Sequence, residues 1–430
     1  MREALRELGL DAARFGTAEW NPIGDLVPAG AKIVVKPNWV LHRNEGSGGT
    51  DELITHASVL RAILEYVWLA NPGKVVVGDA PLQICDFGAM MKLGFDRVAD
   101  YFKSSGREIV VKDFRRTVMV REDTRADVSE NLKPLDDFVI VDLGRDSLLE
   151  PISGDAGKFR VTMYDPRKMG ENHRPGVHRY LIARDVLEAD LVINVPKLKT
   201  HKKAGVTLAL KNLVGINGNK DFLPHHRKGA ANRGGDNYAE ASLPKTAAEN
   251  LLDFINRHLD KPRFYQRSAV MIYKLLWFDK IRGRLTDIEG GWHGNDTIWR
   301  TCLDLNKALI YADANGRFHD TPQRKTLHIC DGIIGGEGEG PLRPIARKAG
   351  VITAAINATA HDWIATKIMG FDPALIPICR HAFDAQKFPL ADFSPDSIEI
   401  RGSPLMPAQP PFKPAAGWRA KLLAQETANL

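Results

Sequence analysis

The stretch "KIVVKPNWV" at residues 32–40 opens the unit that decides the fold. It is apolar and β-branched, as expected for a buried strand, and it ends in the polar residues Lys36 and Asn38 around a proline. An amphipathic helical pattern follows at 56–70, and a second apolar strand, "KVVVGDAP", occupies 74–81. Apolar strands that alternate with helices are typical of parallel sheets covered on both faces. The sequence therefore predicts an α/β fold with a largely parallel β-sheet and flanking helices.

The same alternation extends along the 430-residue chain. Further strands are predicted at 108–114, 137–143, 190–197, 325–333, 350–357 and 397–402. Further helices are predicted at 87–106, 246–259 and 264–285. The segment 217–245 is polar, rich in Gly, Asn and His, and without periodicity, which is typical of a functional loop or lid. We expect two lobes with a lid-like insertion, and a division of the chain into 1–216, 217–320 and 321–430.

Positive charge is concentrated in one segment. The chain has a net charge of +6, yet residues 197–233 hold nine Lys or Arg and one acidic residue, so the rest of the chain is net −2. A track for nucleic acid needs a basic stripe, usually with aromatic stacking platforms. The only Phe, Trp or Tyr in this segment is Phe222. We expect a small anionic partner and no nucleic acid, with RNA binding kept as an alternative.

The composition also indicates which cofactors are not expected to bind and in which compartment the protein is expected. The chain has four cysteines and no CxxC motif, which argues against an iron–sulphur cluster or a zinc ribbon. The N-terminus is charged, and no apolar run reaches 18 residues, so we expect a cytoplasmic protein without a transmembrane helix. The basic amphipathic pattern at 264–285 leaves contact with a membrane surface open, beside a core or interface helix. No pattern indicates the oligomeric state.

Polar residues follow several of the predicted strands. In open parallel sheets, ligands bind outside the carboxyl ends of the strands. We therefore predict that Lys36, Asp79, Lys197 and Lys199 line one cleft, together with the glycine-rich stretch at 330–341. The alternative is that polar residues simply collect where strands leave the core.

The basic run "KLKTHKK" lies between two core-like segments. If the chain stays extended after Pro196, Lys197, Lys199 and His201 share one face. The next segment, 206–214, has a helical pattern, and the N-terminus of a helix would add backbone N–H donors for an anion. Lys211 lies within this apolar helix, so it either contacts a ligand or forms a structural ion pair. A solvated charge run is the competing interpretation of the lysines.

We expect the stretch "CDGIIGGEGEGP" at 330–341 to form a loop after a strand, and this loop is both glycine-rich and acidic. The glycines would allow close ligand approach, while the carboxylates suit a cation such as Mg²⁺ better than a bare phosphate. A tight acidic surface turn is the alternative. The adjacent His225 and His226 beside Arg227 favour a lid that contacts phosphate or carboxylate over a metal site.

These patterns give three groups of candidate site residues. The predicted catalytic residues are Lys199, His201 and Lys211, with His201 as the general acid or base. The predicted substrate-binding residues are Lys36, Asn38, Lys197, Asn212, His225, His226 and Arg227. The predicted ligands of Mg²⁺ or another divalent cation are Asp79, Asp331 and Glu337.

Five stretches together resemble the family called domain of unknown function 362. They are "KPNWV" (36–40), "GDAP" (78–81), "NVPKLKTHKKAGVTLALKNLVGINGNKDFLPHHRKG" (194–229), "GNDTIWRTCLDLN" (294–306) and "DGIIGGEGEGP" (331–341). The family is defined by sequence, so the resemblance implies little about chemistry. Some members carry ferredoxin-like cysteine motifs that this chain lacks, so an iron–sulphur role does not carry over.

Three functions are compatible with these patterns. The first is an enzyme that acts on a small phosphate or carboxylate compound at the strand ends. The second is a non-catalytic anion-binding or accessory protein that uses the same site. The third is an RNA-binding protein that uses the basic segment 197–233.

Overall fold

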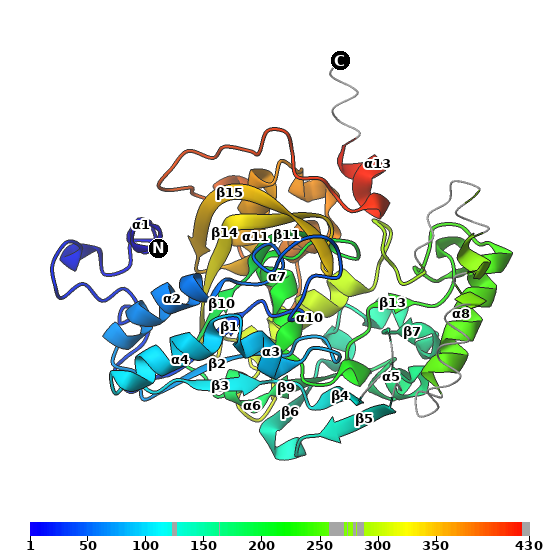
Figure 1. Ribbon diagram of the computed structural model, residues 1–430, viewed down its shortest axis with the longest axis horizontal. Helices are drawn as coiled ribbons and strands as arrows, with labels where there is room; N and C mark the ends of the chain where they lie inside the picture. Colours follow the sequence, from blue (N-terminus) through cyan, green and yellow to red (C-terminus); the bar gives the residue numbers. More distant parts are fainter. Residues whose placement is uncertain are drawn as a thin grey trace.

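The computed structural model describes residues 1–122, 127–162, 164–257, 271–272, 274–277, 281 and 288–423. The centre of this described part is an eight-stranded sheet with the strand order β12-β11-β14-β10-β1-β2-β3, in which β15 pairs with β14 (Figure 1). All pairings are parallel except β11 with β12 and β14 with β15. The strands are β1 (Lys32–Pro37), β2 (Lys74–Asp79), β3 (Val110–Asp113), β10 (Leu191–Val195), β11 (Lys197–His201), β12 (Gly205–Val206), β14 (Lys325–Glu339) and β15 (Arg343–Ala355).

Helices cover both faces of this sheet. Alternate residues of β1 point to opposite sides, so Val34 joins one hydrophobic cluster while Ile33 and Val35 join the other. The first cluster includes residues of α7, α10 and α11, and the second includes residues of α2 and α4. The α/β fold class with a largely parallel sheet and flanking helices is therefore confirmed.

The helices of the described residues are α1 (Arg2–Glu7), α2 (Ala57–Leu69), α3 (Phe87–Met91), α4 (Phe95–Ser104), α5 (Pro166–Asn172), α6 (Arg184–Leu187), α7 (Leu208–Asn212), α8 (Leu243–Asn256), α10 (Ile298–Tyr311), α11 (Ala358–Ile368), α12 (Pro377–Arg380) and α13 (Arg419–Leu422). The helix predicted at 56–70 is present as α2, the one at 246–259 as α8 with a shift of three residues, and the one at 87–106 as two separate helices, α3 and α4. The helix predicted at 264–285 lies largely outside the described residues. Among the residues that are described, no helix has the length and apolar character needed to cross a membrane.

Smaller antiparallel sheets lie beside the main one. Their strands are β4 (Thr117–Glu122) with β5 (Asp127–Leu132), β6 (Phe138–Asp142) with β9 (Val177–Ala183) and β8 (His173–Arg174), and β7 (Phe159–Arg160) with β13 (His226–Arg227). The strand predicted at 137–143 is thus present as β6, but it is not part of the parallel sheet. The three-part division of the chain stays a prediction.

The segment 217–245 is folded against the rest of the protein. It contains a 3-10 helix, η7 (Lys220–Phe222), and strand β13. Asn217, Asp236 and Asn237 within it are almost fully buried. Movement of this segment as a lid stays a prediction.

The glycine-rich stretch at 330–341 was expected to be a loop, and this expectation is wrong. Residues up to Glu339 continue β14, which forms a long hairpin with β15 (Figure 1). A Cβ atom at Gly336 would lie 2.6 Å from the backbone oxygen of Glu52, and one at Gly335 would lie 2.9 Å from that of Leu198. The glycines therefore let neighbouring backbone approach β14 closely. The strand predicted at 397–402 is also absent, since a 3-10 helix (Pro395–Ser397) is followed by irregular chain.

The N-terminus of α7 was expected to offer N–H groups to a ligand anion. Instead, the backbone N–H groups of Ala209 and Leu210 donate to the two carboxylate oxygens of Asp362, at 2.7 and 2.8 Å. The helix N-terminus therefore already holds an anion, which the protein itself supplies. This contact fixes the position of α7 against α11.

Candidate functional site

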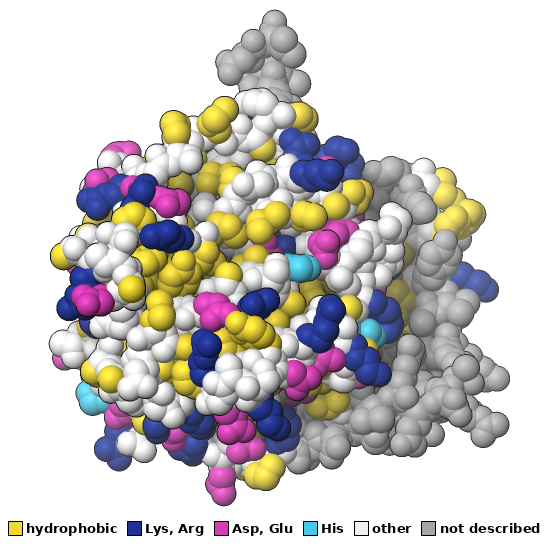
Figure 2. All heavy atoms as spheres, turned by 60° about the vertical axis from the view of Figure 1, so that its left-hand side comes forward, with side chains coloured by type: hydrophobic (Ala, Val, Ile, Leu, Met, Phe, Trp, Pro, Cys, Tyr) yellow, Lys and Arg dark blue, Asp and Glu magenta, His cyan; other side chains and the backbone are white. Residues whose placement is uncertain are grey.

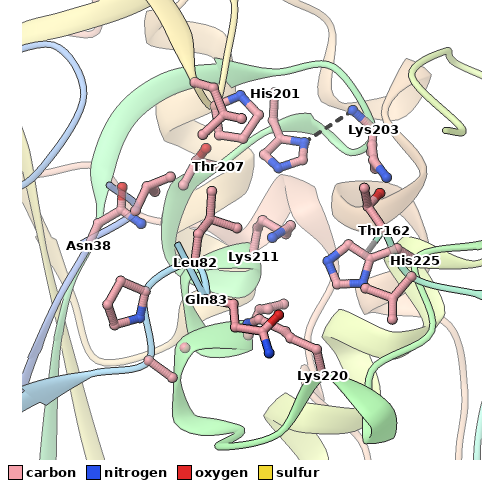
Figure 3. A pocket seen from close by; sticks show the side chains of 18 of the residues that line it. Asn38, Leu82, Gln83, Thr162, His201, Lys203, Thr207, Lys211, Lys220 and His225 are labelled. Carbon is pink, nitrogen blue, oxygen red and sulfur yellow. Dashed lines mark hydrogen bonds between the residues drawn. The ribbon is translucent and has the colours of Figure 1, made fainter. Parts of the chain in front are cut away.

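A cavity of about 310 Å³ lies at the carboxyl ends of β1 and β2, beside β11 and α7 (Figure 3). This is the edge at which parallel sheets bind ligands. Its apolar wall includes Trp39, Leu82, Ile84, Val161, Val214 and Leu342. Six of the predicted site residues border it, namely Asn38, Asp79, His201, Lys211, Asn212 and His225.

A buried ion pair lies at the strand ends beside the cavity. Lys36 Nζ is 2.8 Å from Asp79 Oδ1, and the second carboxylate oxygen accepts the backbone N–H of Trp39 at 2.6 Å. Burial is the largest influence on both groups: it lowers the pKa of Lys36 and raises that of Asp79, and the attraction between the two charges opposes both shifts. Lys36 therefore binds a protein carboxylate in this structure.

A row of polar side chains crosses the sheet from this pair. Lys36, Asn194 and His328 are register partners on β1, β10 and β14. Asn212 of α7 lies over the row, accepting from Lys36 at 3.3 Å and donating to Asn194 at 2.7 Å. Asn38 also donates to Asn212, at 2.7 Å. The row therefore holds the carboxyl end of α7, and with it the neighbouring Lys211, at the cavity.

Two lysines border the cavity without a carboxylate partner. Among the residues that the structure describes, the side-chain amines of Lys211 and Lys220 have no hydrogen bond or ion pair. Burial lowers the pKa of both amines, and that of Lys220 falls to about 7, with the nearby Lys211 as the next largest cause. The cavity thus presents two amines whose charge is poorly solvated and not neutralised.

Two histidines, His201 and His225, lie at the cavity (Figure 3), and their hydrogen bonds assign the ring protons to different nitrogens. His201 Nδ1 accepts the backbone N–H groups of Lys203 and Ala204 at 3.1 and 3.2 Å, which leaves the proton on Nε2. His225 Nδ1 lies 2.7 Å from the backbone oxygen of Leu223, so it donates and its Nε2 is the bare acceptor. Burial, with nearby lysines, holds the pKa of both rings well below the usual value. Both rings are therefore neutral, and neither Nε2 atom has a hydrogen-bond partner in the described part of the chain: that of His201 is a donor and that of His225 an acceptor.

Several buried polar atoms at the cavity lack a protein partner. Within the described part of the chain, Asn38 Oδ1, Gln83 Oε1 and Thr207 Oγ1 make no hydrogen bond. A buried polar atom left unsatisfied costs about 1–3 kcal/mol.

Lys197 and Lys199 do not border this cavity, so this part of the single-cleft prediction is wrong. Lys197 pairs with Asp331 at 2.8 Å, and Asp331 also accepts the backbone N–H of His56. Lys199 donates to the backbone oxygen of Leu53 at 2.5 Å, and burial lowers its pKa strongly. The side chain of Lys197 is thus directed to Asp331 on β14, and that of Lys199 to the backbone of Leu53.

Of the other predicted residues, Arg227 and Glu337 have partners in the protein, whereas Nδ1 of the buried His226 has none among the described residues. Arg227 lies 3.5 and 3.4 Å from Asp236 and Asp296, and the neighbouring His226 is buried in β13. Glu337 accepts the backbone N–H of Lys413. Asp79, Asp331 and Glu337 are therefore held at separate places. No group of three or more His, Cys, Asp or Glu side chains in the described ranges is arranged to hold a metal ion.

The polar cavity residues that sequence reasoning missed include Gln83, Thr207 and Lys220. Lys220 was counted only as part of the charge of segment 197–233. Its position immediately after the apolar helix pattern, in "NGNKDF", was the available signal. Gln83 and Thr207 carry no such signal, because their role depends on the shape of the cavity.

Gly215 of the 3-10 helix η6 (Leu213–Ile216) contacts the buried ion pair directly. A Cβ atom there would lie 1.8 Å from Asp79 Oδ1 and 2.7 Å from Lys36 Nζ. Because the ion pair is locked, Gly215→Ala should destabilise the fold by about 1–3 kcal/mol, the usual range for overpacking. Chemical denaturation measures this change. Gly154→Ala is the matched control, since nothing lies within 4 Å of a Cβ there, and equal effects of the two variants would contradict the prediction.

Comparison with known proteins confirms the family. Residues 155–367 match the family described as "Domain of unknown function (DUF362)", and this part of the chain belongs to it. A thylakoid-associated protein of Synechocystis sp. is 22% identical over 357 residues, covering 83% of this chain and 68% of that protein. A crystal structure of a Thermotoga maritima protein aligns with 81% of this chain at 11% identity and a TM-score of 0.30. The alignment spans 54% of that protein's length.

Proposed function

We propose that this protein is an enzyme that binds a small anionic molecule in the cavity at the ends of β1 and β2. The observation that carries the proposal is the pair of lysines, Lys211 and Lys220, that border the cavity without a carboxylate partner among the described residues. An anion would satisfy both amines and raise their pKa values. The neutral rings of His201 and His225 would supply one proton donor and one acceptor to the bound molecule.

Lys211→Ala should weaken binding of small anions by about 1.5–3 kcal/mol, the range for a hydrogen bond to a charged group. Isothermal titration calorimetry should compare a monocarboxylate, a dicarboxylate, pyrophosphate and a nucleotide. Lys92 is an exposed lysine outside the cavity, so Lys92→Ala provides the control and should leave binding unchanged. Equal affinity of wild type and Lys211→Ala for every anion would contradict the proposed site.

The two alternative functions give different results in the same series. A non-catalytic accessory protein would bind the anion, but NMR would detect no conversion of it by the wild-type chain. An RNA-binding protein would bind single-stranded polymers with a steep salt dependence and ignore the small anions. On the face drawn in Figure 2, charged side chains of both signs are interspersed and form no continuous basic track, which favours a small ligand.

We also propose that a divalent cation can bind at the cavity. Of the predicted Mg²⁺ ligands only Asp79 borders the cavity, so a divalent cation would bind together with the anion. Repeating the calorimetry with and without Mg²⁺ tests this.

We propose the cytoplasm as the compartment of this protein. Because the Synechocystis relative is thylakoid-associated, the membrane surface is the alternative, and cell fractionation distinguishes the two.

A further inference from the structure

The charged groups of the cavity suit a carboxylate better than a phosphate. Proteins bind phosphate through lysine as a point charge, but the planar and multidentate recognition of phosphate comes from arginine forks, helix N-termini or glycine-rich backbone nests. Among the described residues that line the cavity there is no arginine. The N-terminus of α7 is already occupied by Asp362, and the glycine-rich stretch 330–341 is largely a β-strand. Four lysines line the cavity, Lys202, Lys203, Lys211 and Lys220, beside the acidic Glu45, Asp79 and Glu289. Of these lysines, Lys211 and Lys220 have no carboxylate partner among the described residues, and with the donor of His201 and the apolar wall they fit a small carboxylate.

Lys220 is placed to do more than hold charge. It is the first residue of η7 and borders the cavity, where its amine has no partner among the described residues and the wall includes apolar Trp39 and Val214. We propose that the substrate is a small carboxylate that also carries a ketone or aldehyde carbonyl, and that Lys220 forms an imine with this carbonyl. This inference rests on the proposed function, because it assumes that the cavity binds an anionic substrate.

The environment of Lys220 meets the requirement for a nucleophilic amine. A lysine attacks a carbonyl only as the neutral amine, which proteins obtain by burial in an apolar pocket or by placing a second cation nearby. Both causes act here, since burial and the charge of Lys211 lower the pKa of Lys220 to about 7. At pH 7 its neutral fraction is then roughly 10³-fold larger than that of an ordinary lysine with a pKa of about 10.4.

The reaction balances without an oxidant or reductant. The lone pair of Lys220 Nζ forms a bond to the carbonyl carbon, and the carbonyl oxygen takes up a proton to give a carbinolamine. Loss of this oxygen as water leaves a carbon–nitrogen double bond. The amine gives up two protons in total, and both leave in the water molecule.

The neighbouring side chains can transfer the protons that imine formation requires. His225 Nε2 is an unprotonated acceptor that could take a proton from the attacking amine. His201 Nε2 carries a proton that could be donated to the carbonyl oxygen or to the carboxylate. Lys211 would bind the carboxylate, and this contact would keep Lys211 charged while Lys220 reacts.

Borohydride trapping tests the inference directly. Sodium borohydride reduces an imine to a stable secondary amine, which mass spectrometry of proteolytic peptides can assign to one lysine. The full-length chain is incubated at pH 7 with pyruvate, 2-oxobutyrate, 2-oxoglutarate or glyoxylate and then reduced. We expect labelling at Lys220 at least about tenfold faster than at exposed Lys92, because of the larger neutral fraction of its amine.

Matched variants separate the role of the amine from that of the charge. Lys220→Arg keeps a positive charge but cannot form an imine, so it should lose the adduct and still bind the anion. Lys92→Arg should label at Lys220 like the wild type. Circular dichroism and thermal melting of Lys220→Arg confirm that the variant is folded.

Calorimetry and labelling together distinguish a failure of the imine from a failure of the proposed anion site. If calorimetry shows that pyruvate and its hydroxy counterpart, lactate, both bind to the cavity but no probe labels Lys220, the imine is overturned and the anion site stands. Labelling of Lys211 in place of Lys220 would overturn the assignment of the nucleophile. If no carboxylate binds and none labels, both the inference and the carboxylate site fail.

Discussion

Replacing Asp79 by alanine should lower the free energy of unfolding by about 3–5 kcal/mol, the range for breaking a buried ion pair from one side. The reason is that Lys36, which is fully buried, would keep its charge without the carboxylate 2.8 Å away. The backbone N–H of Trp39 would also lose its acceptor. Chemical denaturation of the wild type and of Asp79→Ala measures the difference.

The control is a variant in which both charges are removed together. Lys36→Met with Asp79→Leu replaces the pair by apolar side chains of similar size, which is often neutral or stabilising. The double variant should therefore recover most of the stability that Asp79→Ala loses. A double variant as unstable as the single one, or a loss below about 1 kcal/mol for Asp79→Ala, would contradict the assignment of Asp79 as the counter-ion of Lys36.

The parallel sheet could be predicted because its determinants are local. "KIVVKP" and "KVVVGD" are apolar along their length, which in a strand means burial on both faces. Their carboxyl ends were correctly expected to lie together, as the Lys36–Asp79 pair shows. The rule that ligands bind at these ends then placed the cavity near Asn38 and Asp79.

The partners of the charged residues could not be predicted, because they depend on contacts between distant segments. Lys197 is neutralised by Asp331 across β11 and β14, and the N-terminus of α7 is bound by Asp362 of α11. The sequence around these residues gives no sign of either pairing. The glycines of 330–341 were misread for the same reason: what requires Gly336 is the backbone of Glu52, which is distant in sequence.

Acidification from pH 7 to pH 5 should destabilise the protein by about 4 kcal/mol through His173 and His328 alone. Burial lowers the pKa of each ring from 6.5 to about 3. The unfolded chain therefore binds protons at these residues as the pH falls below 6.5, while the folded chain does not until about pH 3. Each such ring costs about 2 kcal/mol at pH 5, and His201, His225 and His226, whose pKa values are also lowered, act in the same direction.

The contribution of His173 can be isolated by His173→Phe. The ring lies between aromatic neighbours, with Phe159 and Tyr180 at centroid distances of 6.2 and 5.2 Å, so phenylalanine fits the same surroundings. The variant would lose the hydrogen bond to the backbone oxygen of Phe222 at every pH, whereas its loss of stability between pH 7 and pH 5 should be smaller by about 2 kcal/mol. Buried carboxyl groups such as Asp79 and Asp362 have raised pKa values, so they change the stability in the opposite direction as the pH falls. Their contribution is the same in the variant and the wild type, and it cancels when the two are compared. Denaturation curves at four pH values in this window, together with NMR of the His173 ring nitrogens at pH 5, make the measurement. Identical pH dependence of the two proteins, or a protonated His173 ring in the folded state at pH 5, would show that burial does not keep this ring neutral.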